Sequence, residues 1–393
     1  DSCYLLARTN YPLTKSMELI KQSGQFSVDN IARGFWPQVQ IMGQASYQSE
    51  VTQLPIKIPG MNIPTLSQDQ YKLYADVNQT LYDGGVNKQQ QALQKSNTAA
   101  ELQKTETELY KLKERINQLY FGILLVDAQL KQTDILKADL NNMLDRVNAG
   151  INGGIALNSH AELIQAEMLK LEQRTIELNA GRTAYINMLG LFINRDLPSN
   201  TTLLTPVSLN SSTTISRPEL QIFDLQNQLL VNQKNLLTAK NRPKLSVFVQ
   251  AGFGRPALNM LNNDFKSYYI GGLRLNMPIS GFYTLKNEKA IIQLNHDLIE
   301  AQRSGFLFNT NLQLKQQEAE VEKIQKLLNT DDALINLRIS IRKTAAIQLE
   351  NGVLQTTDYL HELNAEDQAR QNKALHQIQL LMTAYSIANT AGH

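Results

Sequence analysis

Cysteine, long apolar runs and an excess of charge of one sign are scarce in this chain of 393 residues. Because Cys3 is the single cysteine, an intrachain disulfide and a cysteine-based metal cluster are excluded. Cys3 is interpreted either as an ordinary helix residue or as the site of a lipid anchor. No run of roughly 18 apolar residues occurs, so a transmembrane helix is not expected. The net charge of +2 gives no electrostatic argument for a nucleic-acid partner.

Proline is missing from a long central segment, between Pro64 and Pro198. Within it, apolar residues recur every seven positions in two series that are offset by three. They are Leu102, Leu109, Ile116, Ile123 and Leu130, and Leu112, Leu119, Val126, Leu140 and Val147. This a/d seam predicts a long coiled-coil helix over 88–148. On the heptads alone, a cytoskeletal or scaffold coiled coil is an equally good interpretation.

Prolines bracket two further helices, one in each half of the chain. Pro12 and Pro37 lie 25 positions apart, and Pro218 and Pro243 have the same separation (37 − 12 and 243 − 218). Proline is tolerated in the first turn of a helix and poorly inside it, so each pair predicts a helix between its two members.

After the second proline of each pair the periodicity becomes two. Apolar residues alternate with polar ones in four segments: 39–47, 72–81, 245–253 and 273–277. They predict two β-hairpins, over about 37–82 and 244–278. Strands with one apolar and one polar face are typical of outer-membrane barrels, and a half-buried sheet of a soluble protein is the alternative.

The predicted fold class is α+β, a tandem repeat of helix, β-hairpin, long helix and return helix, over 1–205 and 206–393. The helices of the first repeat are 12–36, 88–148 and 158–193. Those of the second are 218–242, 285–350 and 357–388. Glycines, which are usual just beyond a helix end, follow the long helices at Gly150, Gly153, Gly154 and Gly352.

Four strands cannot close a barrel, and open sheet edges are not tolerated in lipid. The sequence therefore predicts a homo-oligomer with rotational symmetry, in which several copies share one barrel and the long helices continue it as a tube. A tube with one end in a membrane is a conduit. Five aromatic residues at the strand–helix junctions are expected either to form an interfacial belt or to pack there: Phe35, Trp36, Tyr82, Phe282 and Tyr283.

Three motifs, together with the repeat, resemble the TolC family of outer-membrane efflux and secretion proteins over essentially the whole chain. Residues 9–12, Thr-Asn-Tyr-Pro, are similar to the family's Asn-Asn-Pro segment. Residues 81–85, Leu-Tyr-Asp-Gly-Gly, resemble its apolar-aromatic-Asp/Ser-Gly-Gly turn, and residues 352–360 resemble the tip of its second repeat. The resemblance implies a trimer with a shared 12-stranded transmembrane β-barrel and a periplasmic α-helical barrel.

The resemblance also implies a function. The chain would form the passive exit duct of a tripartite efflux or type I secretion system in the outer membrane of a Gram-negative bacterium, with a long periplasmic extension. Its partners would be outer-membrane lipid, a periplasmic adaptor protein and an inner-membrane transporter. No enzymatic activity, cofactor or metal site is expected. A soluble coiled-coil scaffold or adaptor protein remains the alternative.

The site residues implied by the resemblance lie at the helix tips. The expected adaptor contacts are Gly154 and Ile155 in the first repeat and Gly352 and Val353 in the second, and the first tip looks longer than the family pattern.

Some members of the family carry two aspartates, three residues apart, around the periplasmic aperture. Asp358 matches the first position, His361 occupies the second, and Glu362 follows. Such a mixed ring would titrate near neutral pH, because an unperturbed histidine has a pKa of about 6.5. The alternative is that Asp358 caps the return helix.

Overall fold

The computed structural model describes residues 2–52, 65–207 and 214–393, which divide into two compact units. The helical unit comprises Asp1–Glu18, Gln103–Gln221 and Gln302–His393. The sheet unit comprises Leu19–Leu102 and Ile222–Ala301. Each unit is described by itself.

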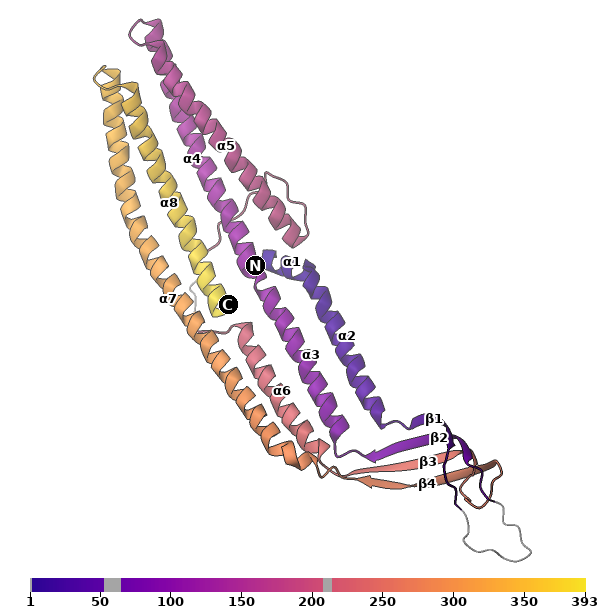
Figure 1. Cartoon of the computed structure of the whole chain (residues 1–393). Helices are drawn as coiled ribbons and strands as arrows, with labels where there is room; N and C mark the ends of the chain where they lie inside the picture. The colour runs from indigo at the N-terminus through magenta and orange to yellow at the C-terminus, as the bar shows by residue number, and fades with distance from the viewer. Residues whose placement is uncertain (1, 53–64, 208–213) are drawn as a thin grey trace, which may run out of the picture. The chain divides into compact units, whose positions relative to one another are not determined.

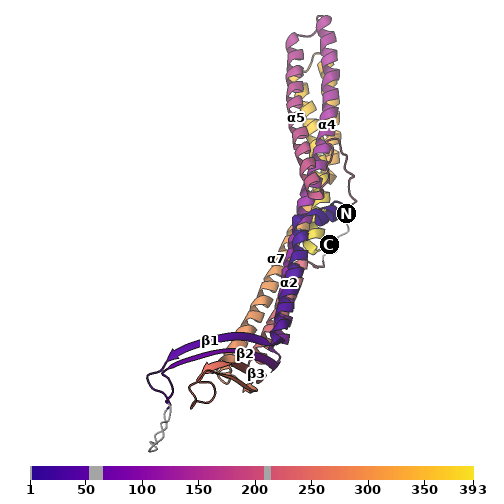
Figure 2. The same cartoon turned by 90° about the vertical axis from the view of Figure 1, so that its right-hand side faces the viewer.

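Two long helical hairpins make up most of the helical unit (Figures 1 and 2). The first pairs α4 (Leu112–Asn152) with α5 (Asn158–Ile193), and α5 has the predicted bounds. The second pairs the later part of α7 (Gly281–Glu350) with α8 (Thr356–Ala391). The hairpins are joined because α4 also packs against α8.

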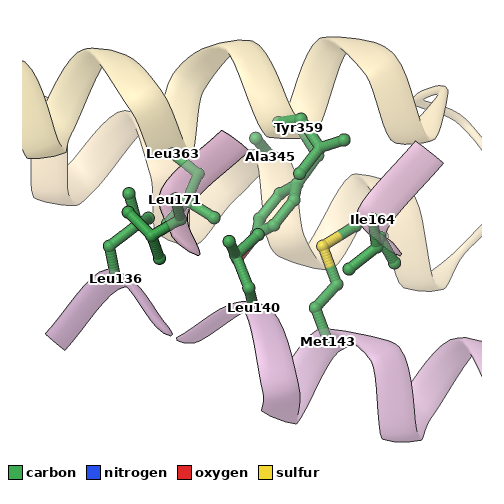
Figure 3. Close-up of a cluster of buried hydrophobic side chains, with 9 residues drawn as sticks. Leu136, Leu140, Met143, Ile164, Leu171, Ala345, Tyr359 and Leu363 are labelled. Carbon is green, nitrogen blue, oxygen red and sulfur yellow. The ribbon is translucent and has the colours of Figure 1, made fainter. Parts of the chain in front are cut away.

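One core is shared by the two hairpins. It consists of Leu136, Leu140, Met143, Ile164, Leu171, Ala345, Tyr359, Leu360 and Leu363. Leu140 is completely buried, and the ring of Tyr359 extends from α8 toward it (Figure 3). Full burial of a large apolar side chain contributes about 1.5–3 kcal/mol, so this cluster is a main source of the attraction between the hairpins.

The long helix predicted over 88–148 is interrupted once, between α3 (Val86–Tyr110) and α4. The intervening Lys111 keeps helical dihedrals, with φ −62° and ψ −17°, and its N–H donates to the Thr107 carbonyl at a long 3.3 Å. A ψ this shallow is typical of a 3₁₀ turn and loosens the α-helical ladder locally. The interruption coincides with contacts to the end of α8, because the Tyr110 hydroxyl donates to the Asn389 carbonyl at 2.7 Å.

The other helices begin where the sequence predicts, with two exceptions. Pro12 is the first residue of α2 (Pro12–Ala32), which a short 3₁₀ turn follows, and Pro218 is the first residue of α6 (Pro218–Lys240). The second long helix, α7, starts four residues earlier than predicted and continues unbroken for 70 residues. A short helix, α1 (Ser2–Asn10), was not predicted; it packs on α4 and α5 and includes the half-buried Cys3.

Among the residues placed in the structure, no helix combines the length and apolarity needed to cross a membrane.

The sheet unit contains parts of α2, α3, α6 and α7 and a four-stranded antiparallel sheet in the order β1-β2-β3-β4 (Figure 1). The strands are β1 (Gln38–Tyr47), β2 (Asp69–Tyr82), β3 (Lys244–Arg255) and β4 (Lys266–Asn276). Both predicted hairpins form, and pairing of β2 with β3 joins them into one sheet. Within the described residues, β1 and β4 each have a strand neighbour on one side only, so both edges of the sheet are open.

Candidate functional site

The tip of the first hairpin is a tight turn closed by glycine. The N–H groups of Ile155 and Ala156 both donate to the Gly150 carbonyl, at 2.9 and 3.2 Å. Gly154 has a φ of +73°, a left-handed conformation that is costly for residues with a Cβ atom. This is the backbone pattern with which helices commonly end.

The tip of the second hairpin has the same hydrogen bonds. The N–H groups of Val353 and Leu354 both donate to the Gln348 carbonyl, at 2.8 and 3.2 Å, and Gly352 has a φ of +67°. The two tips therefore match residue for residue with an offset of 198 (352 − 154). The glycines at 150 and 153 therefore do not make the first turn longer than the second, and the expected difference from the family pattern stays a prediction.

Each tip presents one branched apolar side chain to solvent. Ile155 is 88% exposed and Val353 is 76% exposed. A methyl group added at Gly154 or Gly352 would have no neighbour within 4 Å, so each glycine is required by its backbone conformation and not by crowding. The two tips are thus alike in backbone conformation and in carrying one exposed apolar side chain each.

The first turns of α8 place Asp358 and His361 in solvent. The N-cap residue of α8 is Gln355, and Asp358 follows in the first turn, so Asp358 is not the capping residue. Asp358 and His361 are both exposed, and their spacing of three puts them on one face of the helix. The opposite face is held in the shared core by Tyr359, Leu360 and Leu363.

Glu362 differs from these two residues because it has a partner within its own hairpin. Its Oε2 lies 3.1 Å from Nη1 of Arg338 on α7, and both side chains are partly buried. Glu362 is therefore less available to a solute than Asp358 or His361.

One helical turn further along α8, a group of charges connects three helices. Glu366 has a side chain only 6% exposed, and its Oε2 lies 2.6 Å from Nε of Arg342 on α7. Its Oε1 lies 2.7 Å from Nη2 of Arg370. Arg342 also reaches Asp139 on α4 at 3.4 Å, so a single guanidinium contacts α4 and α8 from α7. Sequence analysis missed this group; the spacing of four between Glu366 and Arg370 was a signal for part of it.

The strand register gathers the apolar positions of the sheet unit on one face. Ile41 pairs with Ala75, Ala75 with Ala251, and Ala251 with Tyr269. Directly paired residues of antiparallel strands point to the same side of a sheet. The same face therefore carries Val39, Leu73, Val77, Val247, Val249, Phe253, Leu273 and Leu275. This apolar face is open to solvent in the single chain, with Ile41 80% exposed and Leu275 72% exposed.

Polar and aromatic groups bound the apolar face at both ends. At the loop end, the rings of Tyr71 and Phe265 stack on each other, and the Arg255 guanidinium lies beside both, 5.7 and 5.5 Å from their centroids. It also pairs with Asp69 at 2.5 Å. At the helix end, Gln79 donates to the carbonyl of residue 35 at 2.7 Å. The five junction aromatics are exposed there: Phe35, Trp36, Tyr82, Phe282 and Tyr283.

The opposite face of the sheet, called the polar face below, is mainly hydrophilic. In register it carries the side chains of Gln38, Gln40, Gln44, Lys72, Asp76, Asn78, Lys244, Ser246, Gln250, Lys266, Arg274 and Asn276.

Comparison with known proteins gives matches in structure alone: no family model and no curated protein sequence matches the chain. The outer membrane protein VceC of Vibrio cholerae matches with a TM-score of 0.72 at 13% identity, over 99% of this chain and 95% of that one. The CmeC outer membrane channel of Campylobacter jejuni matches with 0.70 at 13% identity, over 99% and 84%. The MtrE outer membrane channel of Neisseria gonorrhoeae, in its open state, matches with 0.68 at 12% identity, over 99% and 88%.

These matches cover nearly the whole chain, so the protein has the fold of outer-membrane channels. The predicted combination of long helices with a small antiparallel sheet, as in TolC-like channels, is confirmed for the single chain.

Proposed function

We propose that the protein is the passive exit duct of a tripartite efflux or type I secretion system, placed in the outer membrane of a Gram-negative bacterium. The observation that carries the proposal is the apolar face of an open-edged sheet. Exposed apolar surface of this extent requires a nonaqueous neighbour, and outer-membrane lipid is the partner that fits a sheet whose other face is polar. In a soluble coiled-coil scaffold this apolar face would stay exposed to water, which is unfavourable.

The dimensions of the sheet agree with a lipid-facing barrel wall. Val39 to Tyr47 spans nine residues of β1, which agrees with the roughly 9–11 residues that a strand tilted by about 45° needs to cross a bilayer. The aromatic groups at its two ends occupy the positions of the interfacial girdles.

The open edges of β1 and β4 support assembly of several copies. Backbone N–H and C=O groups left unpaired in lipid cost several kcal/mol each, so each edge needs a partner strand. Three copies of the four-stranded sheet would supply the 12 strands of a closed barrel, which makes the homotrimer our proposal for the assembled state.

The helical unit would extend into the periplasm and meet the other components at its tips. Ile155 and Val353, carried by the turns of Gly154 and Gly352, offer two equivalent apolar contacts for a periplasmic adaptor protein. An inner-membrane transporter would supply the energy, because a duct of this kind performs no chemistry.

Asp358 and His361 are the side chains that we assign to the periplasmic aperture. Both are exposed on one face of α8, whereas Glu362, also expected there, is paired with Arg338 and contributes less charge. Replacing Asp358 and His361 by Ala is expected to change cation conductance and selectivity. Unchanged values in the double variant would contradict the aperture assignment.

The first experiment is conductance of the detergent-purified protein in a planar lipid bilayer, combined with its mass in solution. Discrete current steps from a species of three chains are expected. A protein that stays in solution without detergent and gives no steps would contradict the duct and favour the scaffold.

A further inference from the structure

We infer that the sheet-lined section of the duct favours anionic solutes, so that multivalent anions are the substrate class this part of the wall selects. The inference rests on the proposed function, because it takes the polar face of the sheet as the wall of the lumen.

The charges on the polar face are unbalanced. Its cations are Lys72, Lys244, Lys266 and Arg274, and its single carboxylate is Asp76, which gives +3 for each chain (4 − 1). The chain as a whole has a net charge of only +2, so the excess of positive charge is concentrated on this surface. On the apolar face the register places two charged residues, Asp69 and Arg255, and these pair with each other.

Two of the amines form a row at the loop end of the sheet. Lys72 pairs with Gly254, and Gly254 pairs with Lys266, so the two lysines flank a residue that has no side chain. Two strand spacings separate them by about 9.6 Å. The Lys72 side chain lies over the glycine, because a methyl group added at Gly254 would come within 3.2 Å of its Cγ. Lys72 and Lys266 thus lie on the same side of the sheet, on the two strands that flank Gly254.

The other two cations lie at the helix end of the same face. Arg274 pairs with Ser246, and its guanidinium lies 4.8 Å from the centroid of the Phe248 ring, which holds the charge over the sheet. Lys244 pairs with Asn276, on the same side of the sheet and two positions further along β4.

These cations are not neutralised by the sheet itself. In the part of the chain that the structure describes, no ion pair joins Lys72, Lys244, Lys266 or Arg274 to a carboxylate. Asp76 is flanked across the sheet by Gln40 and Gln250, which carry no charge. A lumen wall with an excess of positive charge, surrounded by lipid, raises the local concentration of anions.

The test measures block of single channels by inorganic tripolyphosphate in a planar bilayer at low salt. In the unmodified protein, tripolyphosphate added on the side of the strand loops should reduce the current, and hexamminecobalt(III) added there should not. K72Q/K266Q should raise the half-blocking concentration about tenfold, as expected if each of the two lysine positions, summed over the copies in the barrel, contributes roughly threefold in a high-dielectric channel. D76N, which removes the opposing charge, is the matched control and should lower it.

The outcomes separate this inference from the proposed function. Channels that tripolyphosphate does not block from the loop side, or a D76N variant that shifts in the same direction as K72Q/K266Q, would overturn the anion preference and leave the duct intact. Protein that forms no channels would overturn the duct and, with it, the inference. Equal unit conductance of the variants at high salt would establish that their barrels are formed normally.

Discussion

Replacing Arg342 by methionine should weaken the packing of the two helical hairpins. Methionine keeps most of the length of the side chain and removes the guanidinium that lies 2.6 Å from Glu366 and 3.4 Å from Asp139. The Glu366 side chain is only 6% exposed, so water cannot replace the lost partner. The substitution on α7 therefore removes contacts with both α4 and α8.

The size of the effect follows from what Glu366 retains. Removing the only partner of a buried charge typically costs about 3–5 kcal/mol. Arg370 still lies 2.7 Å from the same carboxylate, so we expect R342M to lower the free energy of unfolding by about 2–3 kcal/mol. Asp139, which is more exposed, should add little.

The assay is guanidinium denaturation of the detergent-solubilised protein at pH 7, followed by far-ultraviolet circular dichroism. E366Q and the double variant complete a cycle, in which we expect a coupling energy of about 1 kcal/mol or more. The matched control is K326M, which removes a solvent-exposed partner of Glu322 in the same helix and should leave stability unchanged. Equal stability of R342M and K326M, or additive effects in the cycle, would refute the reasoning.

The remaining predictions concern backbone, ionisation and helix packing. G352A should destabilise the protein by about 1 kcal/mol, because the φ of Gly352 is +67°. The control G305A, at an exposed position in the middle of α7, should stabilise it by about 0.5–1 kcal/mol. Thermal unfolding shows whether the two changes in stability have opposite signs. Burial raises the pKa of Tyr110 from 10.0 to about 12, so its contribution to stability is complete below pH 10 and lost as the pH rises to 12. An absorbance titration at 295 nm should show one fewer tyrosine ionising near pH 12 in Y110F, and an unchanged titration would exclude this. G24A should destabilise the packing of α2 on α3, because the new methyl group overlaps the Thr98 side chain. Adding T98A should recover most of the lost stability. If the double variant is as unstable as G24A, this overlap is not the cause.

Helix bounds were predictable wherever a residue with a fixed backbone preference marks an end. Pro12 and Pro218 start their helices, and the return helix α5 has the predicted bounds 158–193 after the glycine turn of the first tip. The interruption at Lys111 was not predictable, because the seam continues through Leu109 and Leu112 without a break. It depends on contacts with segments far away in the sequence, which a local pattern does not contain.

The helix tips were predictable in position, the partners of the nearby charges were not, and the role of the tips as a site stays a prediction. The tip residues follow from glycine and from the resemblance, but nothing local to Glu362 indicates that Arg338 neutralises it. Likewise, alternation assigns Lys72 and Lys266 to the face opposite the apolar one, yet only the register places both beside Gly254. The trimer and the closed barrel stay predictions, because both depend on contacts between chains.

The open edges of the sheet make the newly synthesised chain prone to aggregate before it assembles. The hairpins of the helical unit bury their apolar residues within one chain, and so we expect this unit to become compact early. The sheet has no such option, since large side chains of its apolar face are exposed and the outer edges of β1 and β4 pair with no strand of the described chain. Until other copies arrive, these strands are a template for aggregation. Production of the protein should therefore depend on its concentration at the membrane and on chaperones that bind extended apolar strands.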